Sequence, residues 1–110
     1  VVSLASLCVL LMFHGEAQAK LTNTVVTKIL VAFDNNIQVT FADTVRDSGS
    51  TCRGDIVNQL ALQANTEAGK AQLSALIAAK MSGKRVTVAG RVTACDSANI
   101  EQLAWVRIED

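Results

Sequence analysis

The fold of this chain is decided by residues 66–92, which read TEAGKAQLSALIAAKMSGKRVTVAGRV. In the first part, Leu73, Leu76 and Ile77 recur at spacings of three and four, which is typical of one face of a helix. The threonine that opens the stretch, or the asparagine before it, can cap the first turn, and Gly83 is the expected stop. The stretch therefore predicts an amphipathic helix that ends just before a new element.

That new element is a strand. After the glycine, Val86, Val88 and Val92 alternate with polar residues, which is the period of a half-buried strand. Gly90 interrupts the pattern and predicts a bulge or a close approach of another group. A polar loop from Cys95 to Asn99 follows, and residues 100–108 form the last predicted strand.

Upstream of the helix, residues 24–42 predict a β-hairpin. Val25, Ile29, Val31 and Phe33 form one alternating run, and Ile37, Val39 and Phe41 form a second. Between the two runs, Asp34-Asn35-Asn36 predicts a turn, because Asn and Asp tolerate positive φ. A polar loop over residues 43–55 carries Cys52, and Ile56, Leu60 and Leu62 mark a third strand.

The predicted order is three strands, a helix and two strands, β-β-β-α-β-β. This is the order of the OB-fold, a five-stranded Greek-key barrel in which a helix joins the third and fourth strands. Closing the barrel also removes the edges that an open sheet exposes. The alternative is an open α+β sandwich with the helix on one face. Both folds predict the same disulfide, between the loop after the second strand and the loop after the fourth.

The amino-terminal run of residues 1–13 is uncharged and apolar, and it is too short to span a bilayer. Ala17 and Ala19 provide the small residues that a signal peptidase reads, so cleavage is expected between Ala19 and Lys20. A buried core helix would need a partner sheet, and a lipoprotein signal would need a small residue before its cysteine. We therefore expect residues 1–19 to be a signal peptide that lacks its first few residues.

Residues 20–110 are then one domain, secreted or periplasmic in a bacterium. Cys8 and the only histidine, His14, leave with the signal, so two cysteines remain in an oxidising compartment. We predict that Cys52 and Cys95 form a disulfide. The alternatives are a metal pair, which would want His or a C-x-x-C motif, and a redox thiol.

Composition narrows the function classes. The formal net charge is 0, with no basic stripe and no tyrosine for stacking, so nucleic-acid binding is not expected. Without a histidine in the predicted mature chain, no base serves a hydrolytic triad, and Ser82 with Lys84 is typical of a helix end. Phosphate-binding glycine motifs are absent. We expect no enzyme and no cofactor.

Three residues of the last predicted strand are candidate ligand or interface residues: Leu103, Trp105 and Arg107, which share one face if the strand is regular. Leu103 and Trp105 would then be an exposed apolar pair, suited to a subunit interface or a sugar-stacking platform. If a bulge shifts the register, Trp105 belongs to the core.

Two loop motifs give only weak evidence for a binding function. Arg53-Gly54-Asp55 is the tripeptide that integrins read, but so short a match arises easily by chance. Asp43, Asp47 and Asp55 lack the ligand spacing of a calcium loop, so we expect a solvated loop.

The segments LSALIAAKMSGKRVTV at residues 73–88 and LAWVRI at residues 103–108, with Cys95 between them, resemble a group of small exported bacterial proteins. These are similar in turn to the receptor-binding subunit of subtilase cytotoxin and its relatives. The resemblance implies an OB-fold, a structural disulfide and a ring-forming, glycan-binding habit. The sequence-based expectation is thus an exported recognition module that binds a glycan or protein partner, with a homo-oligomer as one form. The alternative is a structural or accessory envelope protein without a small ligand.

Overall fold

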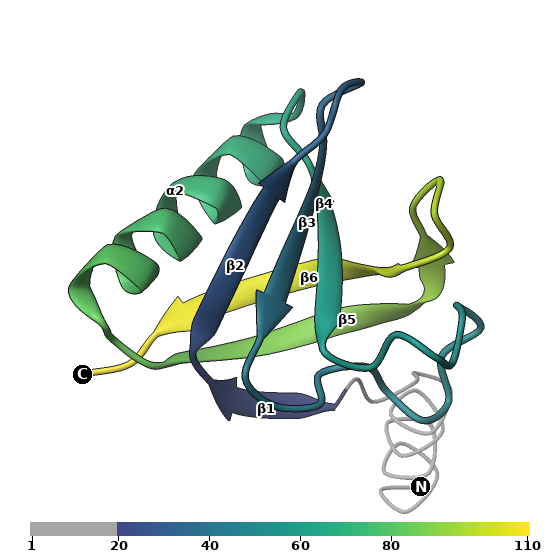
Figure 1. Ribbon diagram of the computed structural model, residues 1–110, viewed down its shortest axis with the longest axis horizontal. Helices are drawn as coiled ribbons and strands as arrows, with labels where there is room; N and C mark the ends of the chain where they lie inside the picture. Colours follow the sequence, from purple (N-terminus) through teal and green to yellow (C-terminus); the bar gives the residue numbers. More distant parts are fainter. Residues whose placement is uncertain (1–19) are drawn as a thin grey trace, which may run out of the picture.

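The computed structural model describes residues 20–110, which form one curled sheet and one helix (Figure 1). The sheet has six strands in the order β1-β5-β6-β4-β3-β2. The elements are β1 (Leu21–Thr24), β2 (Val26–Val31), β3 (Asn36–Phe41), β4 (Gln59–Gln63), α2 (Glu67–Ser82), β5 (Val86–Cys95) and β6 (Glu101–Ile108). The prediction of a mainly β chain with one helix is confirmed, but the strand count of five is wrong.

The additional strand is β1. Only Val25 separates β1 from β2 in the chain, yet the two strands lie at opposite ends of the sheet order. β1 pairs with β5, and β2 pairs with β3. Because consecutive residues connect the two ends of the sheet, the sheet must curl into a half-barrel. Sequence alternation could not separate β1 from β2, because the break at Val25 is a change of partner.

The predicted hairpin and helix are both confirmed. Asp34 and Asn35 have φ values of 66° and 59°, which allows β2 and β3 to pair across the turn. At the start of α2, the Thr66 hydroxyl accepts a hydrogen bond from the Gly69 amide at 2.9 Å. At its end, Gly83 has a φ of 70°, the left-handed conformation of a helix stop.

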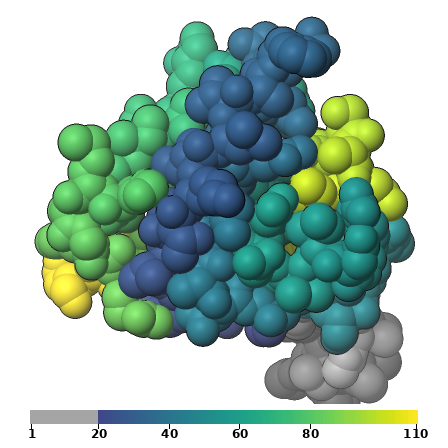
Figure 2. Space-filling view, in the orientation of Figure 1, coloured from purple at the N-terminus to yellow at the C-terminus, as the bar shows by residue number. Residues whose placement is uncertain are grey.

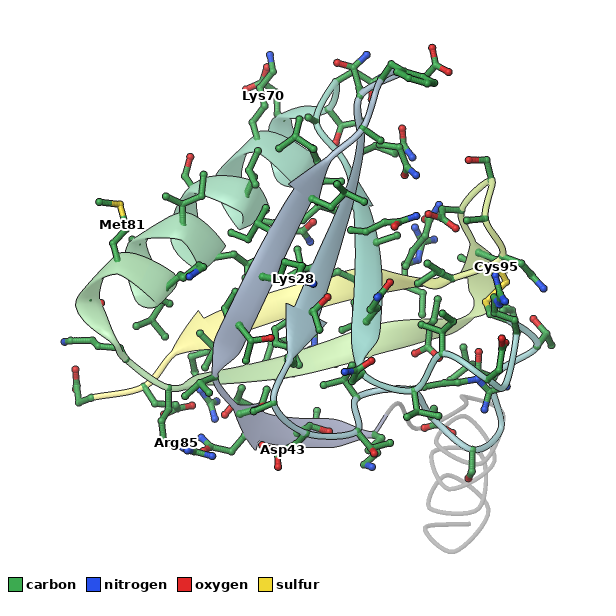
Figure 3. The ribbon with its side chains drawn as sticks, in the orientation of Figure 1. Lys28, Asp43, Lys70, Met81, Arg85 and Cys95 are labelled. Atoms are coloured by element: carbon green, nitrogen blue, oxygen red, sulfur yellow. A yellow bond between two sulfur atoms is a disulfide. The ribbon has the colours of Figure 1, made fainter. Side chains whose placement is uncertain are left out.

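The core lies inside the curl, between the sheet and α2. Leu76 and Ala79 turn the helix toward it, while Met81 points away from the sheet (Figure 3). The buried residues of this cluster are Val26, Ile37, Val39, Phe41, Val45, Leu60, Leu62, Leu76, Ala79, Val86, Val88 and Leu103. These residues form a hydrophobic core within residues 20–110.

The irregularity predicted at Gly90 is also confirmed. The pairing of β5 with β6 shifts between Ala89 and Gly90, and Ala104 is the residue of β6 that the pairing skips. A Cβ atom on Gly90 would lie 1.8 Å from the Glu101 carboxylate, so no larger residue fits without displacing that side chain.

The predicted disulfide joins Cys52 to Cys95, with Cα atoms 5.7 Å apart. It connects the loop over residues 43–58 to the end of β5, and the two regions form adjoining surfaces in the space-filling view (Figure 2). Backbone hydrogen bonds from Thr51 to Val92 and from Arg53 to Asn99, both 2.9 Å, flank the bridge. A disulfide of this kind is consistent with an oxidising environment.

The predicted signal peptide, with Ala17 and Ala19 of its cleavage site, lies outside the described residues; only Lys20 falls within them. Among residues 20–110, no helix has the length and apolar character needed to cross a membrane.

Candidate functional site

The boundary between β4 and β6, called here the β4–β6 seam, has the least strand pairing in the sheet. These strands are parallel and share a single register pair, Ala61 with Gln102. By contrast, β5 and β6 are paired along most of their length. Where two strands diverge, their backbones no longer fill the space between them, so a recess can form beside the seam.

A pocket of about 310 Å³ occupies this recess. β4, β6 and the first turns of α2 form its walls, and β5 adds one residue, Arg91. The lining residues are Ala61, Leu62, Gln63, Thr66, Ala68, Gly69, Gln72, Arg91, Gln102, Leu103 and Ala104. Gly69 allows α2 to start this close to β4, because a Cβ atom there would lie 1.6 Å from the Gln63 carbonyl oxygen.

Three glutamine side chains give the pocket its polar character. The Gln72 Nε2 donates to the Ala104 carbonyl at 3.0 Å, and the Gln63 Nε2 donates to the Asn36 Oδ1 at 3.2 Å. Gln102 Nε2 donates to the Cys95 carbonyl at 3.5 Å. Each amide is therefore oriented by its nitrogen, and its carbonyl oxygen can accept a hydrogen bond from a ligand.

Arg91 is the only charged residue among those that line the pocket. It is exposed, and it takes part in none of the ion pairs found within residues 20–110. The guanidinium group offers up to five N–H donors. With no carboxylate in the lining, the pocket has a positive charge and suits a neutral or anionic polar ligand.

A partly buried polar network braces one side of the pocket. The Asp96 Oδ1 accepts from the amides of Ala98 and Ile100 at 2.9 and 2.8 Å, and its Oδ2 accepts from Asn36 Nδ2 at 3.0 Å. Gln38 Nε2 also donates to the same Oδ2, at 3.3 Å. Since Asn36 in turn holds Gln63, the turn between β5 and β6 and the wall of the pocket are connected.

The three candidate residues of the last strand do not share one face. Trp105 pairs with Ala89 and is 39 % exposed, whereas Leu103 pairs with Gly90 and is 5 % exposed, within the core. The skipped residue Ala104 reverses the side-chain direction between them. The expected exposed pair of Leu103 and Trp105 is therefore wrong, and so is the alternative that a bulge would place Trp105 in the core.

Trp105 instead belongs to a row across the outer face of three strands. Leu21 of β1 pairs with Ala89, and Ala89 pairs with Trp105. Leu21 is 62 % exposed, while the small Ala89 between them is buried. The result is an apolar row from β1 to β6.

Arg107 lies beside this row, as expected from its spacing to Trp105. Its guanidinium carbon lies 6.0 Å from the centre of the indole ring, the outer limit of a cation–π contact. The Glu109 Oε1 accepts from Arg107 Nε at 2.7 Å and from Thr87 Oγ1 at 2.8 Å. The hydrogen bond from Arg107, and then that from Thr87, lowers the pKa of Glu109.

The integrin-like tripeptide is closed on itself. The Arg53 guanidinium donates to both carboxylate oxygens of Asp55, at 2.8 and 2.6 Å. This hydrogen-bonded pair lowers the pKa of Asp55. Both charged ends of the motif are therefore directed at each other.

Other predicted groups also have local partners. The Ser82 hydroxyl donates to the Ala78 carbonyl at 2.8 Å, and Lys84 Nζ lies 3.9 Å from an Asp110 oxygen. Within residues 20–110, no three potential metal ligands come together, and Asp43, Asp47 and Asp55 are not gathered into such a group.

Sequence reasoning missed the residues of the pocket, Gln63, Gln72, Arg91 and Gln102. No sequence motif contains these four residues, because each lies on a different helix or strand. The glutamines also do not recur at a regular spacing. Of the three candidate ligand or interface residues, Leu103 alone is among the residues that line the pocket, and the helix start at Thr66 lies at the same corner.

Comparison with known proteins identified no relative of this chain. No family model matches the chain, and searches of curated proteins and of solved structures found no significant match.

Proposed function

We propose that this protein is an exported, non-enzymatic recognition module that binds a glycan in the pocket between β4, β6 and α2. The observation that carries the proposal is the pocket's lining: three oriented glutamine amides and one exposed arginine above an apolar floor. Small-ligand sites in proteins combine such a floor with a few fixed polar groups.

A sugar ring fits this chemistry better than the other ligand classes. Its hydroxyl groups both donate and accept, which matches amides that do the same, and its C–H face matches the partly exposed Ala104. The volume of about 310 Å³ is at the lower end for ligand sites, so one or two sugar rings would fill it. Arg91 would favour a glycan without a positive charge.

The fold proposal is an OB-like barrel in which β1 and β2 are two halves of one bent strand. Val25 alone separates them, and a single bent strand would reduce the count to five. The parallel pairing of β4 with β6 supports this, because the third and fifth strands of such a barrel run parallel.

The apolar row of Leu21, Ala89 and Trp105 is the proposed contact surface for a protein partner. A structural envelope protein without a ligand predicts a buried Trp105, whereas its 39 % exposure supports an interface. A homo-oligomer resembling toxin-binding subunits is one assembly that would cover the row. The disulfide supports export to an oxidising compartment, with cleavage after Ala19.

The test is a glycan array probed with residues 20–110, followed by calorimetry on the best glycan. We expect Arg91→Ala and Gln102→Ala each to weaken binding about tenfold or more, since each loses hydrogen bonds to the ligand. The control is Lys28→Ala, which removes an exposed cation of β2 outside the pocket and should bind normally. An array without any bound glycan, or pocket variants that bind as well as the control, would contradict the proposal.

A further inference from the structure

The segment that begins at Lys20 runs alongside the start of the loop over residues 43–58. The Asp43 amide donates to the Thr24 hydroxyl at 3.2 Å, and the Thr22 hydroxyl donates to the Thr44 carbonyl at 3.4 Å. One step further, the Lys20 amide nitrogen donates to Asp47 Oδ2 at 2.8 Å. Three contacts in a row thus hold β1, and the contact to Asp47 is the outermost.

Asp47 is fixed in place from several sides. Its Oδ1 accepts from the Gly49 amide at 2.8 Å, and the Arg46 guanidinium donates to its carbonyl oxygen at 3.1 Å. Its own amide donates to Glu101 Oε1 at 3.3 Å. The carboxylate that receives Lys20 is therefore positioned by its own loop and by β6.

Glu101 connects this exposed contact to the interior. The side chain is 2 % exposed, and its Oε2 is the one buried side-chain oxygen or nitrogen in residues 20–110 without a hydrogen-bond partner. Gly90 leaves the space that this carboxylate occupies. A buried carboxylate makes a positive charge near Asp47 more favourable, and Arg46 and Arg53 are the cations already present on this loop.

The nitrogen that Asp47 accepts is the nitrogen that the predicted signal cleavage would release. Hydrolysis of the bond between Ala19 and Lys20 by a signal peptidase consumes one water and leaves a carboxylate on Ala19 and an amino group on Lys20. That amino group binds a proton near neutral pH. A neutral amide with one donor then becomes an ammonium group with three donors and a full charge.

We propose that Asp47 is the docking site for the new amino terminus at Lys20, so that removal of the signal peptide strengthens the attachment of β1. The inference rests on the predicted cleavage and is independent of the glycan pocket. β1 is an edge strand of four residues paired only with β5, so its free end benefits from a second anchor.

The test is a cycle of four proteins that comprise residues 20–110, which contain the entire described core. Lys20 has either a free amino terminus or an acetylated one, and position 47 is either Asp or Asn. Asp47→Asn keeps an oxygen for the Gly49 amide, so the loop turn should survive. We expect acetylation to lower the Tm by about 2 to 5 °C with Asp47 and by less than about 1 °C with Asn, as for an exposed ion pair in a domain this small.

Asp43→Asn is the matched control, because Asp43 is an exposed acid in the same segment that joins β1 only through its backbone amide (Figure 3). Acetylation should lower the Tm of this variant as it does with Asp47. Equal effects of acetylation with Asp and Asn at position 47 would overturn the docking site.

Mass spectrometry of the exported full chain checks the processing step separately. An amino terminus at Lys20 supports the proposal, and a terminus elsewhere overturns it. Glycan binding of the acetylated protein should be unchanged, so failure of this inference and failure of the proposed glycan site give different results.

Discussion

The loop over residues 43–58 and the pocket beside the β4–β6 seam are both irregular parts of the curled sheet, but they use their polar groups differently. In the loop, the Arg46 guanidinium donates to the carbonyl oxygens of four residues, at 2.7 to 3.1 Å. These acceptors are Asp47, Ser50, Cys52 and Arg53. Inside the pocket, Arg91 is exposed and the glutamines are held by one end only.

The arginines of the two regions differ in what they contact: Arg46 stabilises the loop, and in the proposed function Arg91 contacts a ligand. A cation that satisfies several backbone carbonyls replaces the hydrogen bonds that a strand would provide, and its loss leaves those carbonyls without partners. A cation at the rim of a pocket contributes little to folding and remains available to a ligand. The same residue type thus stabilises the loop in one region and, in the proposed function, contacts a ligand in the other.

The largest expected effect comes from the disulfide, which belongs to the loop. Cys52→Ser with Cys95→Ser opens a link across 43 residues of chain and should lower the free energy of unfolding by about 4 kcal/mol. Hydrogen exchange should show the first loss of protection at the Thr51 and Arg53 amides, and then around Trp105. An unchanged Tm and unchanged protease resistance would contradict the structural role of the bridge.

A smaller effect should distinguish the two arginines directly. Arg46→Met should lower the free energy of unfolding by about 1 to 3 kcal/mol, because several carbonyl groups lose a charged donor. Arg91→Met should change it by no more than about 0.5 kcal/mol, as for other exposed positions. Urea denaturation of both variants makes the comparison, and equal losses of stability would remove the distinction between loop and pocket.

The smallest effect concerns Glu109 beside Trp105, and it depends on pH. The folded chain lowers the pKa of Glu109 below its ordinary value of 4.5, so its stabilising contribution is complete above pH 4.5. That contribution is lost as the pH falls through the lowered pKa. We expect Glu109→Gln to lower the Tm slightly at neutral pH, and the difference to narrow as the solution is acidified. A constant difference over this range would mean that the carboxylate charge is not responsible.

Sequence reasoning predicted the elements with strong local signals. The helix over Glu67–Ser82 was marked by Thr66 and Gly83, and the turn at Asp34 and Asn35 by residues that tolerate positive φ. The disulfide followed from the number of cysteines in a chain expected to be exported. Even the irregularity at Gly90 was visible, because a glycine within an alternating strand often marks a bulge or a close approach.

What the sequence missed depends on pairing between distant residues. The role of β1 requires β5 as a partner, and the inward turn of Leu103 requires the skipped residue at Ala104. The four polar pocket residues meet only after β4, α2, β5 and β6 are assembled. None of these relations has a local pattern, so reading one strand at a time placed Leu103 beside Trp105.

The central claim is that ligands enter at the β4–β6 seam while the disulfide-linked loop is structural. The most direct test follows the backbone and side-chain amide resonances of the protein by NMR as the best glycan from the array is added. The largest shifts should occur at Gln63, Gln72 and Gln102, with Thr51 to Arg53 unaffected. Shifts confined to that loop or to Trp105 and Arg107, with the three glutamines unchanged, would contradict it.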